Sequence, residues 1–479
     1  MAERYGLMVP GAKSSSPAID VLSPYNRRKI GSVATSDTAV AEQALKTAYA
    51  LYRDRDAWLP AWRRVDILER TVEIMTKKAD YLALESAREG GKPLMDSKHE
   101  VSRAIDGVKL CIEALRTQAG EEIPMGISRS SQHRLAFTSL EPIGVVTAVS
   151  AFNHPLNLII HQVCPAVAVG CPVIVKPSED TPLSCMRFVK ILREAGLPDE
   201  WCQPVVTVER EVSQKLVTDS RVGFFSFIGS AGVGWMLRSK LSPGTRCALE
   251  HGGVAPVIMA ADANVKRALP LLAKGGFYHA GQVCVSVQRI FAHHSIARSV
   301  ANGLAKEAKA LKVGDPTKAT TDVGPLIRPR EVDRVAEWVE EARAGGAKVL
   351  AGGKRLSKTC YAPTVLWDPP KNARVSKNEV FGPVVCVYPF RSLDQAIARA
   401  NSLDVSFQAA VFTQDMDTAL RVYKRIDGSA VMLNDHTAFR VDWMPFAGLK
   451  HSGHGVGGIH HTMEEMQAKK MLVLNSPEL

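Results

Sequence analysis

Two consecutive segments, "IGVVTAVS" (143–150) and "PLNLIIHQVCPAVAVG" (155–170), carry the pattern that decides the fold. The first is short and rich in β-branched residues, which is typical of a strand buried on both faces. The second has the apolar spacing of a helix and ends on a glycine. The next segments, "PVIVK" (172–176), "PLSCMRFVKILREAG" (182–196) and "VGFFSFI" (222–228), continue the alternation of strands and helices. This alternation predicts a doubly wound, parallel α/β sheet.

The flanking regions predict further units. After residue 253 a second alternating series begins, with strands expected at 255–260, 286–294 and 429–434. Residues 1–120 have mainly helical spacing, most clearly over 62–92. The polar stretch 121–142 breaks that spacing and is interpreted as a hairpin leaving the main body. The tail "KKMLVLNSPEL" is expected to add one more strand.

The composition is that of a globular protein. The chain has 479 residues, of which 46% are hydrophobic and 23% are charged. Its net charge is +11, but the basic residues are spread along the chain instead of forming blocks. That spread argues against a nucleic-acid surface and favours a mild attraction for small anions.

The cysteines and the N-terminus bear on the compartment. There are nine cysteines, and no two of them have the C-x-x-C spacing of zinc or redox motifs. The N-terminus lacks the apolar core of a signal peptide, and no run approaches the roughly 18 apolar residues of a membrane span. We therefore expect a cytoplasmic protein with free thiols, no bound metal and no membrane contact.

Two strand ends offer ligand groups, because parallel sheets bind ligands at the carboxyl ends of their strands. Lys176 ends one strand and Glu179 follows it, so the pair could hold the hydroxyls of a ribose. The alternative is a solvated strand end. The strand 222–228 runs into Gly229, Gly232 and Gly234, whose spacing would let a phosphate approach a helix start. That spacing matches neither standard phosphate-binding motif, so the turn alone leaves both interpretations open.

Cys284 lies between two valines in "FYHAGQVCVSVQR" (277–289). A cysteine in such a setting is usually a small core residue. Nothing inside the stretch distinguishes packing from chemistry.

The motifs together resemble the aldehyde dehydrogenase superfamily. They occur in the family's order as "FNHP", "KPSE", "FIGSAGVG", "ALEHGG", "HAGQVC", "EVFGPV" and "MPFAGLKHSG". The resemblance covers essentially the whole chain and implies an aldehyde dehydrogenase-like fold with two doubly wound α/β domains and a β-ribbon used for oligomerisation. It implies a dinucleotide-binding domain at 1–120 and 143–252, a catalytic domain at 253–452, and a ribbon at 121–142 and 462–479.

The resemblance also assigns roles to residues. It implies that Cys284 is the nucleophile, Glu250 the general base and Asn153 an oxyanion donor. The residues that it implies for the dinucleotide are Lys176, Ser178, Glu179, Gly229, Ser230, Glu379 and Phe381. The other eight cysteines are interpreted as core or surface thiols.

The chemistry needs these residue types. A thiolate that attacks an aldehyde forms a thiohemiacetal, whose oxyanion can expel hydride to the nicotinamide. Hydride loss leaves a thioester, and Glu250 can activate the water that hydrolyses it if burial raises the pKa of its carboxyl group. Relatives that transfer the acyl group to coenzyme A usually lack this carboxylate, so the resemblance favours a free carboxylic acid as product.

Several positions depart from the family pattern. His251 follows the general base and could tune Glu250, although packing is favoured. His154 and His161 are expected on one helix face, where a role as metal ligands lacks a third partner. Val283, in place of an arginine before the nucleophile, argues against a strongly anionic substrate. Arg103 and Arg440 remain either carboxylate clamps or ordinary ion pairs. Phe152, Trp443 and Phe446 slightly favour apolar or aromatic aldehydes.

The expected cofactor is NAD, with NADP possible, because a carboxylate such as Glu179 accepts the ribose 2′-hydroxyl and repels a 2′-phosphate. The expected partners are an aldehyde and a second copy of the chain, as a homodimer or homotetramer. The alternatives are a coenzyme A-acylating semialdehyde dehydrogenase and a non-catalytic binding protein on the same fold. Nucleic-acid association could coexist with catalysis.

Overall fold

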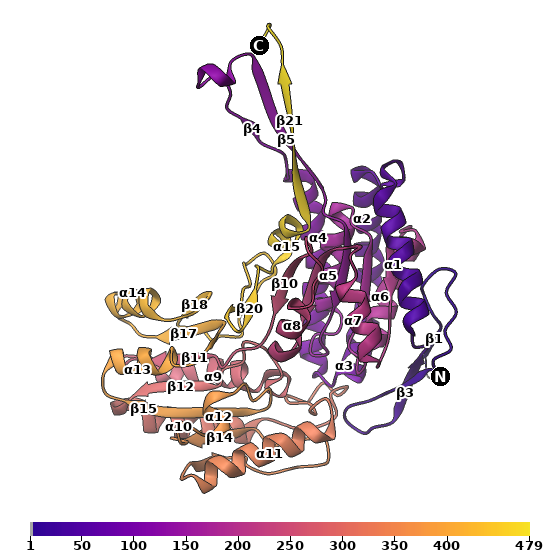
Figure 1. Ribbon diagram of the computed structural model, residues 1–479. Coiled ribbons are helices and arrows are strands. Elements are labelled where there is room, and N and C mark those ends of the chain that lie inside the picture. Colours follow the sequence, from indigo (N-terminus) through magenta and orange to yellow (C-terminus); the bar gives the residue numbers. More distant parts are fainter. Residues whose placement is uncertain (1–2) are drawn as a thin grey trace.

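The computed structural model describes residues 3–479, and a six-stranded sheet forms the centre of its first half (Figure 1). The strand order is β20-β10-β9-β6-β7-β8, and all neighbours are parallel except β20. The strands are β6 (Val145–Val149), β7 (Val173–Lys176), β8 (Cys202–Pro204), β9 (Val222–Ile228), β10 (Arg246–Glu250) and β20 (Gly453–His454).

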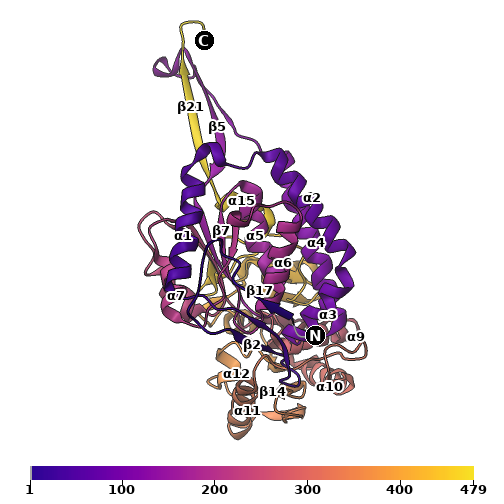
Figure 2. The ribbon, with the colours of Figure 1, turned by 90° about the vertical axis from the view of Figure 1, so that its right-hand side faces the viewer.

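Helices cover both faces of this sheet because alternate strand residues point in opposite directions. Val146 and Val173 pack on one face with α2, α4, α5 and α6, whereas Val145 and Ile174 pack on the other with α1 and α7. Figure 2 shows these two helix layers on either side of β7. The helices of this half are α1 (Thr38–Arg53), α2 (Ala61–Lys77), α3 (Ala79–Gly90), α4 (Leu94–Thr117), α5 (Asn157–Val169), α6 (Pro182–Glu194), α7 (Arg210–Thr218) and α8 (Ala231–Arg238).

A seven-stranded sheet with the order β13-β14-β15-β12-β11-β17-β18 forms the second half. Only β13 is antiparallel to its neighbour. Its strands are β11 (Pro256–Met259), β12 (Arg289–His293), β13 (Lys348–Ala351), β14 (Thr364–Trp367), β15 (Val384–Phe390), β17 (Gln408–Phe412) and β18 (Ala430–Leu433). The helices of this half are α9 (Val265–Phe277), α10 (His294–Ala310), α11 (Pro329–Ala344), α12 (Arg374–Lys377), α13 (Leu393–Ala400) and α14 (Met416–Arg425).

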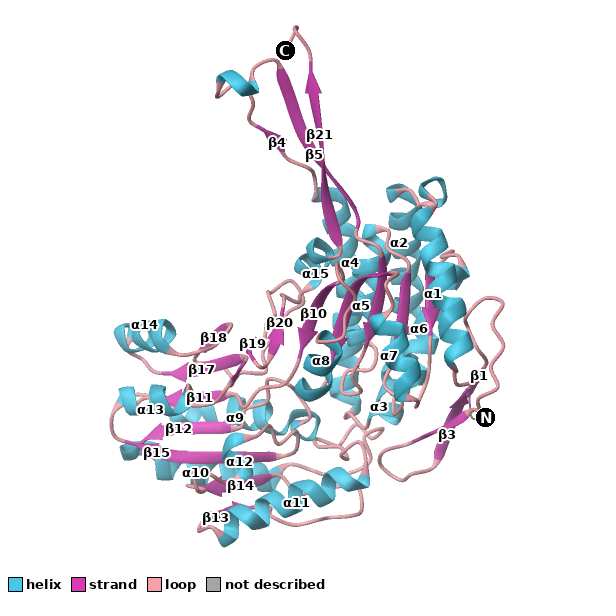
Figure 3. Cartoon of the chain, in the orientation of Figure 1, coloured by secondary structure: helices cyan, strands magenta, loops and turns pink. Residues whose placement is uncertain are grey.

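A third sheet, with the order β21-β5-β4, projects from the body (Figure 3). It consists of β4 (Glu122–Ile123), β5 (Arg134–Pro142) and β21 (Gln467–Asn475), and β21 pairs with β5 in antiparallel register from Gln467–Pro142 to Asn475–Arg134. The short helix α15 (Ile459–Glu465) leads into it. A small pair, β16 (Val405–Ser406) and β19 (Leu449–Lys450), lies outside the main sheets.

The predicted α/β fold class, with two largely parallel sheets, is confirmed, but the N-terminal part of the chain differs from the expectation. Its first segment is a three-stranded sheet of β1 (Glu3–Tyr5), β2 (Ile19–Leu22) and β3 (Lys29–Val33), not helix. Strands of three to five residues are too short for periodicity to reveal. The expected helix over 62–92 is divided at Lys78, which ends α2 and precedes α3.

Within residues 3–479, no helix is both long and apolar enough to cross a membrane.

Candidate active site

Four neighbouring strands of the first sheet deliver functional side chains to one edge. Glu250 is the last residue of β10, Gly229 follows β9, Asn153 lies in the loop after β6, and Lys176 ends β7. Because these strands are parallel and adjacent, their carboxyl ends meet at the same edge. Residues separated by up to 97 positions in the chain are thereby brought together (153 to 250).

The second sheet faces this edge and contributes the other wall. Cys284 lies in the loop between a 3-10 turn (Tyr278–Gly281) and β12, Glu379 and Phe381 precede β15, and Arg440 follows β18. One cavity of about 630 Å³ lies between the two sets. Apart from Trp443, it is lined by the residues predicted for catalysis, cofactor or substrate, namely Arg103, Phe152, Asn153, His154, Lys176, Ser178, Glu179, Gly229, Ser230, Glu250, Val283, Cys284, Glu379, Phe381, Arg440 and Phe446.

The loop before Cys284 has a constrained backbone. His279, Ala280 and Gly281 all lie in the left-handed region, with φ values of 48°, 55° and 70°. The first two are not glycine, so this conformation is strained and must be held by the surroundings. A Cβ on Gly281 would collide with the carbonyl of Gly382, so the cysteine loop can pack this closely on the segment before β15 only with glycine at 281.

Gln282, which the sequence reasoning did not single out, anchors this loop. Its side-chain amide donates to the carbonyls of His279 and Pro325 at 3.2 Å each, and its oxygen accepts the N–H of Ile327 at 3.0 Å. The main chain of Cys284 is held as well, since its carbonyl accepts the N–H of Gly253 at 3.1 Å. The only sequence signal for Gln282 was its place in the family motif "HAGQVC".

Asn153 is held beside the cysteine loop. Its Nδ2 donates to the carbonyl of Gln282 at 3.0 Å, which uses one of the two amide hydrogens and leaves the second available. The start of the following helix is fixed by Glu100, whose carboxylate accepts the N–H groups of Leu156 at 3.0 Å and Asn157 at 3.1 Å. Glu100 is itself paired with Lys92, and both side chains are fully buried. Through the start of this helix, the Lys92–Glu100 pair therefore helps to fix the end of the loop that carries Asn153.

The thiol and the base are both half-buried on the cavity wall. Burial, reinforced by the Glu250 and Glu379 carboxylates, raises the pKa of the Cys284 thiol. Burial also raises the pKa of Glu250, and the nearby Arg440 opposes that rise. Glycine at 457 leaves room for Glu250, because a Cβ there would lie 2.5 Å from Oε1. A base with a raised pKa beside a protonated thiol is an arrangement suited to proton transfer.

The other end of the cavity fits a dinucleotide. Gly229 leads into α8, and a Cβ on it would lie 2.9 Å from the Phe227 ring. Ser230 makes no side-chain cap, so the first N–H groups of α8 are open to an anion. Within the described residues, Oε1 of Glu379 is buried and has no hydrogen-bond partner, which is what a ligand hydroxyl would satisfy. Burial raises the pKa of Glu379 to about 8.

Glu179 is engaged in an ion-pair cluster. Arg328 binds Glu179 at 2.6 Å and Asp180 at 2.7 Å, so one guanidinium is shared by two carboxylates. This joins the strand end of the first sheet to the segment before α11. The positive charge of Arg328 is therefore already neutralised.

The contacts of the three histidines correct the expectation for His154 and His161 and agree with packing for His251. His154 and His161 do not share a helix face, because His154 precedes α5 and its Nε2 contacts the Tyr278 hydroxyl at 2.9 Å, whereas His161 contacts Asp442 at 2.7 Å. His251 contacts the carbonyl of Gly229 at 2.9 Å and packs beside Trp235, so it supports the glycine turn.

Two further features of the described part of the chain bear on the site. Trp443 is 59% exposed and does not line the cavity, so it is not a pocket wall. All nine cysteines are free, and no cluster of three or more metal-ligating side chains is found among residues 3–479.

Comparison with known proteins gives consistent matches over the whole chain. The model of the "Aldehyde dehydrogenase family" matches residues 12–472. The chain is 35% identical to a 3-sulfolactaldehyde dehydrogenase of Priestia aryabhattai, over 99% of this chain and 98% of that protein.

Two solved structures are similar throughout. Aldehyde dehydrogenase 21 of Physcomitrella patens, in complex with the reaction product succinate, has a TM-score of 0.94 and 32% identity, with 99% of each chain covered. Glyceraldehyde-3-phosphate dehydrogenase GapN of Methanocaldococcus jannaschii, complexed with NADP, has a TM-score of 0.91 and 34% identity, covering 96% of this chain and 99% of that one.

Proposed function

The chain belongs to the aldehyde dehydrogenase family, which oxidises aldehydes to acids with NAD(P), and on that premise we propose that Cys284, Glu250 and Asn153 carry the reaction. The observation that supports these roles is the convergence of all three in one cavity, from the ends of two different sheets. The bounds predicted for the two domains and the ribbon stay part of this proposal.

The first step is attack by the Cys284 sulfur on the aldehyde carbon. Because the pKa of this thiol is raised, it is protonated at neutral pH and its proton must be removed. Glu250 lies in the same cavity and, with a raised pKa of its own, is a suitable acceptor for that proton. The product of the step is a thiohemiacetal with a negative oxygen.

Two donors are assigned to this charge in the proposal. The second Nδ2 hydrogen of Asn153 is one, and the backbone N–H of Cys284 is the other. Removing one such donor typically costs about 3 kcal/mol of transition-state stabilisation. The bond from Asn153 to Gln282 keeps the amide in position before substrate arrives.

The cofactor end of the cavity supports binding of the dinucleotide by Lys176, Ser178, Glu179, Gly229, Ser230, Glu379 and Phe381. When bound, the nicotinamide supplies the acceptor for the hydride that leaves the former aldehyde carbon. Glu379 would bind ribose hydroxyls through its unpartnered Oε1.

Hydrolysis completes the reaction. Glu250 first releases to solvent the proton that it took from Cys284. It then takes a proton from the water that attacks the thioester and gives it to the departing Cys284 sulfur, so that the thiol and a free carboxylic acid are formed. The presence of a carboxylate at 250, on the wall of the cavity, supports water over coenzyme A as the acyl acceptor. The relatives are named for different substrates or products, so family membership does not identify the aldehyde. The pocket of this chain must determine it.

Two further properties belong to the proposal. We infer a homo-oligomer, because the strand β21 is an edge of the projecting sheet and carries exposed apolar residues. We also infer a reducing, cytoplasmic setting, because all nine cysteines are free.

The test is to follow NADH formation from NAD and butanal with the wild type, Cys284→Ala and Glu250→Gln. We expect no NADH with Cys284→Ala. With Glu250→Gln we expect at most one equivalent of NADH per enzyme subunit. If that NADH is formed, intact-protein mass spectrometry should show an acyl-enzyme adduct. The matched control is Cys247→Ala, a half-buried thiol outside this cavity, which should leave turnover intact. Thiol-independent NADH, or formation of acyl-coenzyme A on adding coenzyme A, would contradict the proposal.

A further inference from the structure

Arg440 places a positive charge close to the reacting groups. It follows β18 and lines the same cavity as Cys284 and Glu250. Its guanidinium carbon lies 3.5 Å from the centroid of the Phe446 ring, so the cation is stacked on the wall of the cavity. The three side chains therefore border the same space, which a substrate bound at Cys284 would enter.

The guanidinium has no anionic partner within residues 3–479. Nε and Nη2 of Arg440 are buried and make no hydrogen bond, and the side chain takes part in no ion pair. Glu250 lines the same cavity but makes no ion pair or hydrogen bond with Arg440. Asp442, two residues further along the chain, is already used by two other groups. It binds Arg103 through bonds of 3.0 and 2.6 Å, and it contacts His161 at 2.7 Å.

A buried cation without a partner is unfavourable, and it is usually tolerated only where an anion can approach. Arg440 is only partly exposed and it lines the cavity, so a ligand in the cavity can reach it. Arg103 also lines the cavity, but the Nε and Nη2 atoms of its guanidinium are already bound to Asp442. The two arginines were equal candidates in the sequence, and only Arg440 is left with unmet donors.

We propose that Arg440 binds an anionic group at the far end of a short aldehyde substrate, so that the enzyme prefers an aldehyde carrying a terminal carboxylate. This inference rests on the proposed function. Phe152 and Phe446 then flank the carbon chain between the two polar ends. A guanidinium is suited to this task because its planar N–H groups match a carboxylate.

The experiment compares two aldehydes of equal chain length, 4-oxobutanoate and butanal, in the wild type and in Arg440→Met. Methionine keeps an unbranched apolar stem against Phe446 while removing the charge. We expect the wild type to have the higher kcat/KM for 4-oxobutanoate. In Arg440→Met the ratio of the two kcat/KM values should fall roughly 10- to 100-fold, the range expected for a charged hydrogen bond.

Two controls keep the result interpretable. Arg63→Met removes an exposed arginine on α2 and should leave the ratio unchanged. Arg440→Lys keeps the positive charge but not the planar guanidinium. The ratio of the two kcat/KM values should therefore fall less in Arg440→Lys than in Arg440→Met. It also serves if Arg440→Met fails to fold, as judged by circular dichroism.

A binding measurement gives a readout independent of turnover. Calorimetric titration with succinate and butyrate should show tighter binding of succinate to the wild type, and Arg440→Met should remove that difference. An equal loss of kcat/KM for both aldehydes, with a shifted pH profile, would show that Arg440 acts only by tuning Glu250 and would overturn the proposal. So would a wild type that oxidises both aldehydes equally well. Failure of the proposed function is distinct, since then neither aldehyde yields NADH.

A sulfonate or phosphate would use the same donors as a carboxylate. Replacing 4-oxobutanoate by a sulfonate-bearing aldehyde of similar length shows which of these anionic groups the site prefers. A higher kcat/KM for the sulfonate, lost in Arg440→Met, would keep Arg440 as the anion-binding residue and overturn the preference for a carboxylate.

Discussion

Glu179 determines the charge at the end of the cavity where the ribose of a dinucleotide is expected. Its partner Arg328 is shared with Asp180, so the cluster offers two carboxylates for one guanidinium. A 2′-phosphate would meet the Glu179 carboxylate there, whereas a 2′-hydroxyl would find an acceptor.

We therefore predict that the wild type has a higher kcat/KM for NAD than for NADP, and that Glu179→Gln makes this difference smaller. Removing one negative charge should lower the ratio of kcat/KM for NAD over NADP by about tenfold, or about 1.4 kcal/mol. Initial rates with both cofactors at matched concentrations measure it. Glu194→Gln, an exposed glutamate at the end of α6, is the control. A wild type that prefers NADP would refute the role given to Glu179.

Gln282 acts on catalysis through the residues that it holds. Replacing it by alanine leaves the Ile327 N–H and the carbonyls of His279 and Pro325 without their partner. Each unmet buried group costs about 1–3 kcal/mol. The strained backbone at 279–281 then loses the contacts that hold it in place.

We predict that Gln282→Ala lowers the free energy of unfolding by at least about 2 kcal/mol and lowers kcat up to about 100-fold, the scale of effect that a small misplacement of reacting groups produces. Urea titration and steady-state kinetics check the two effects. Gln43→Ala, which loses a single side-chain bond to Thr47, should change neither by a comparable amount. An unaltered kcat would show that the loop keeps its shape without Gln282.

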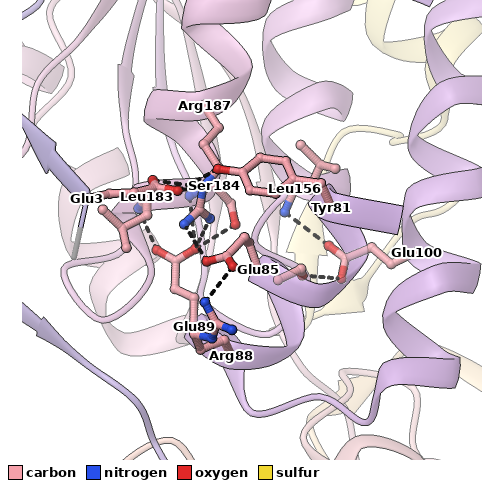
Figure 4. A network of polar contacts seen from close by, with 11 residues as sticks. Glu3, Tyr81, Glu85, Arg88, Glu89, Glu100, Leu156, Leu183, Ser184 and Arg187 are labelled. Carbon is pink, nitrogen blue, oxygen red and sulfur yellow. Dashed lines mark hydrogen bonds and ion pairs between the residues drawn. The ribbon is translucent and has the colours of Figure 1, made fainter. Parts of the chain in front are cut away.

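Helix α6 begins against a buried acid contributed by α3 (Figure 4). Glu89 accepts the N–H groups of Leu183 and Ser184 and the Ser184 hydroxyl, the last at 2.6 Å. Arg187, which also binds Glu3 and Glu85, lies against the same carboxylate. Burial outweighs these favourable contacts and raises the pKa of Glu89 from 4.5 to about 7.

The sign of the resulting pH dependence follows from proton binding. Between pH 4.5 and about 7 the folded protein holds a proton on Glu89 that the unfolded chain has released. The free energy of unfolding therefore falls as the pH rises through that window, and Glu89 contributes no further change above it. The full effect of a shift of this size is up to roughly 3 kcal/mol.

We predict that Glu89→Gln flattens this part of the stability profile, because glutamine does not titrate. Chemical denaturation at intervals between pH 4.5 and 8 measures the slope. Glu73→Gln, an exposed position on α2, should leave the slope as it is in the wild type. If the two variants had the same profile, the titration would have to belong to another group.

The projecting sheet gives the molecule a shape that suits assembly. Met471 and Val473 are exposed on β21, as are Leu472 and Leu474 on its other face. An edge strand with apolar residues on both faces is an aggregation hazard unless another chain covers it.

We predict a homodimer or homotetramer in solution, weakened by the double substitution Met471→Lys and Val473→Lys. Light scattering coupled to size-exclusion chromatography gives the mass of each species. The matched control places two lysines at Leu420 and Tyr423, exposed apolar residues on α14, and should leave the mass unchanged. A wild-type monomer would remove the basis for calling the projecting sheet an assembly element.

The amino-acid sequence by itself determined the features that depend on neighbours along the chain. Alternating β-branched runs and helical segments predicted parallel sheets, and that topology already placed Lys176 and Gly229 at strand ends where ligands bind. The motif around Cys284 could be interpreted only with the family resemblance, because a cysteine between valines is locally the same whether it packs or reacts.

The tertiary structure decided what depends on partners distant in the chain. Arg103 pairs with Asp442, 339 positions away, and Arg440 is left with a guanidinium whose Nε and Nη2 make no hydrogen bond. Gln282 reaches the backbone at 325–327 in the same way. Local patterns carry no record of such pairings, because the choice of partner is made only when two sheets with separate cores are packed edge to edge around one cavity.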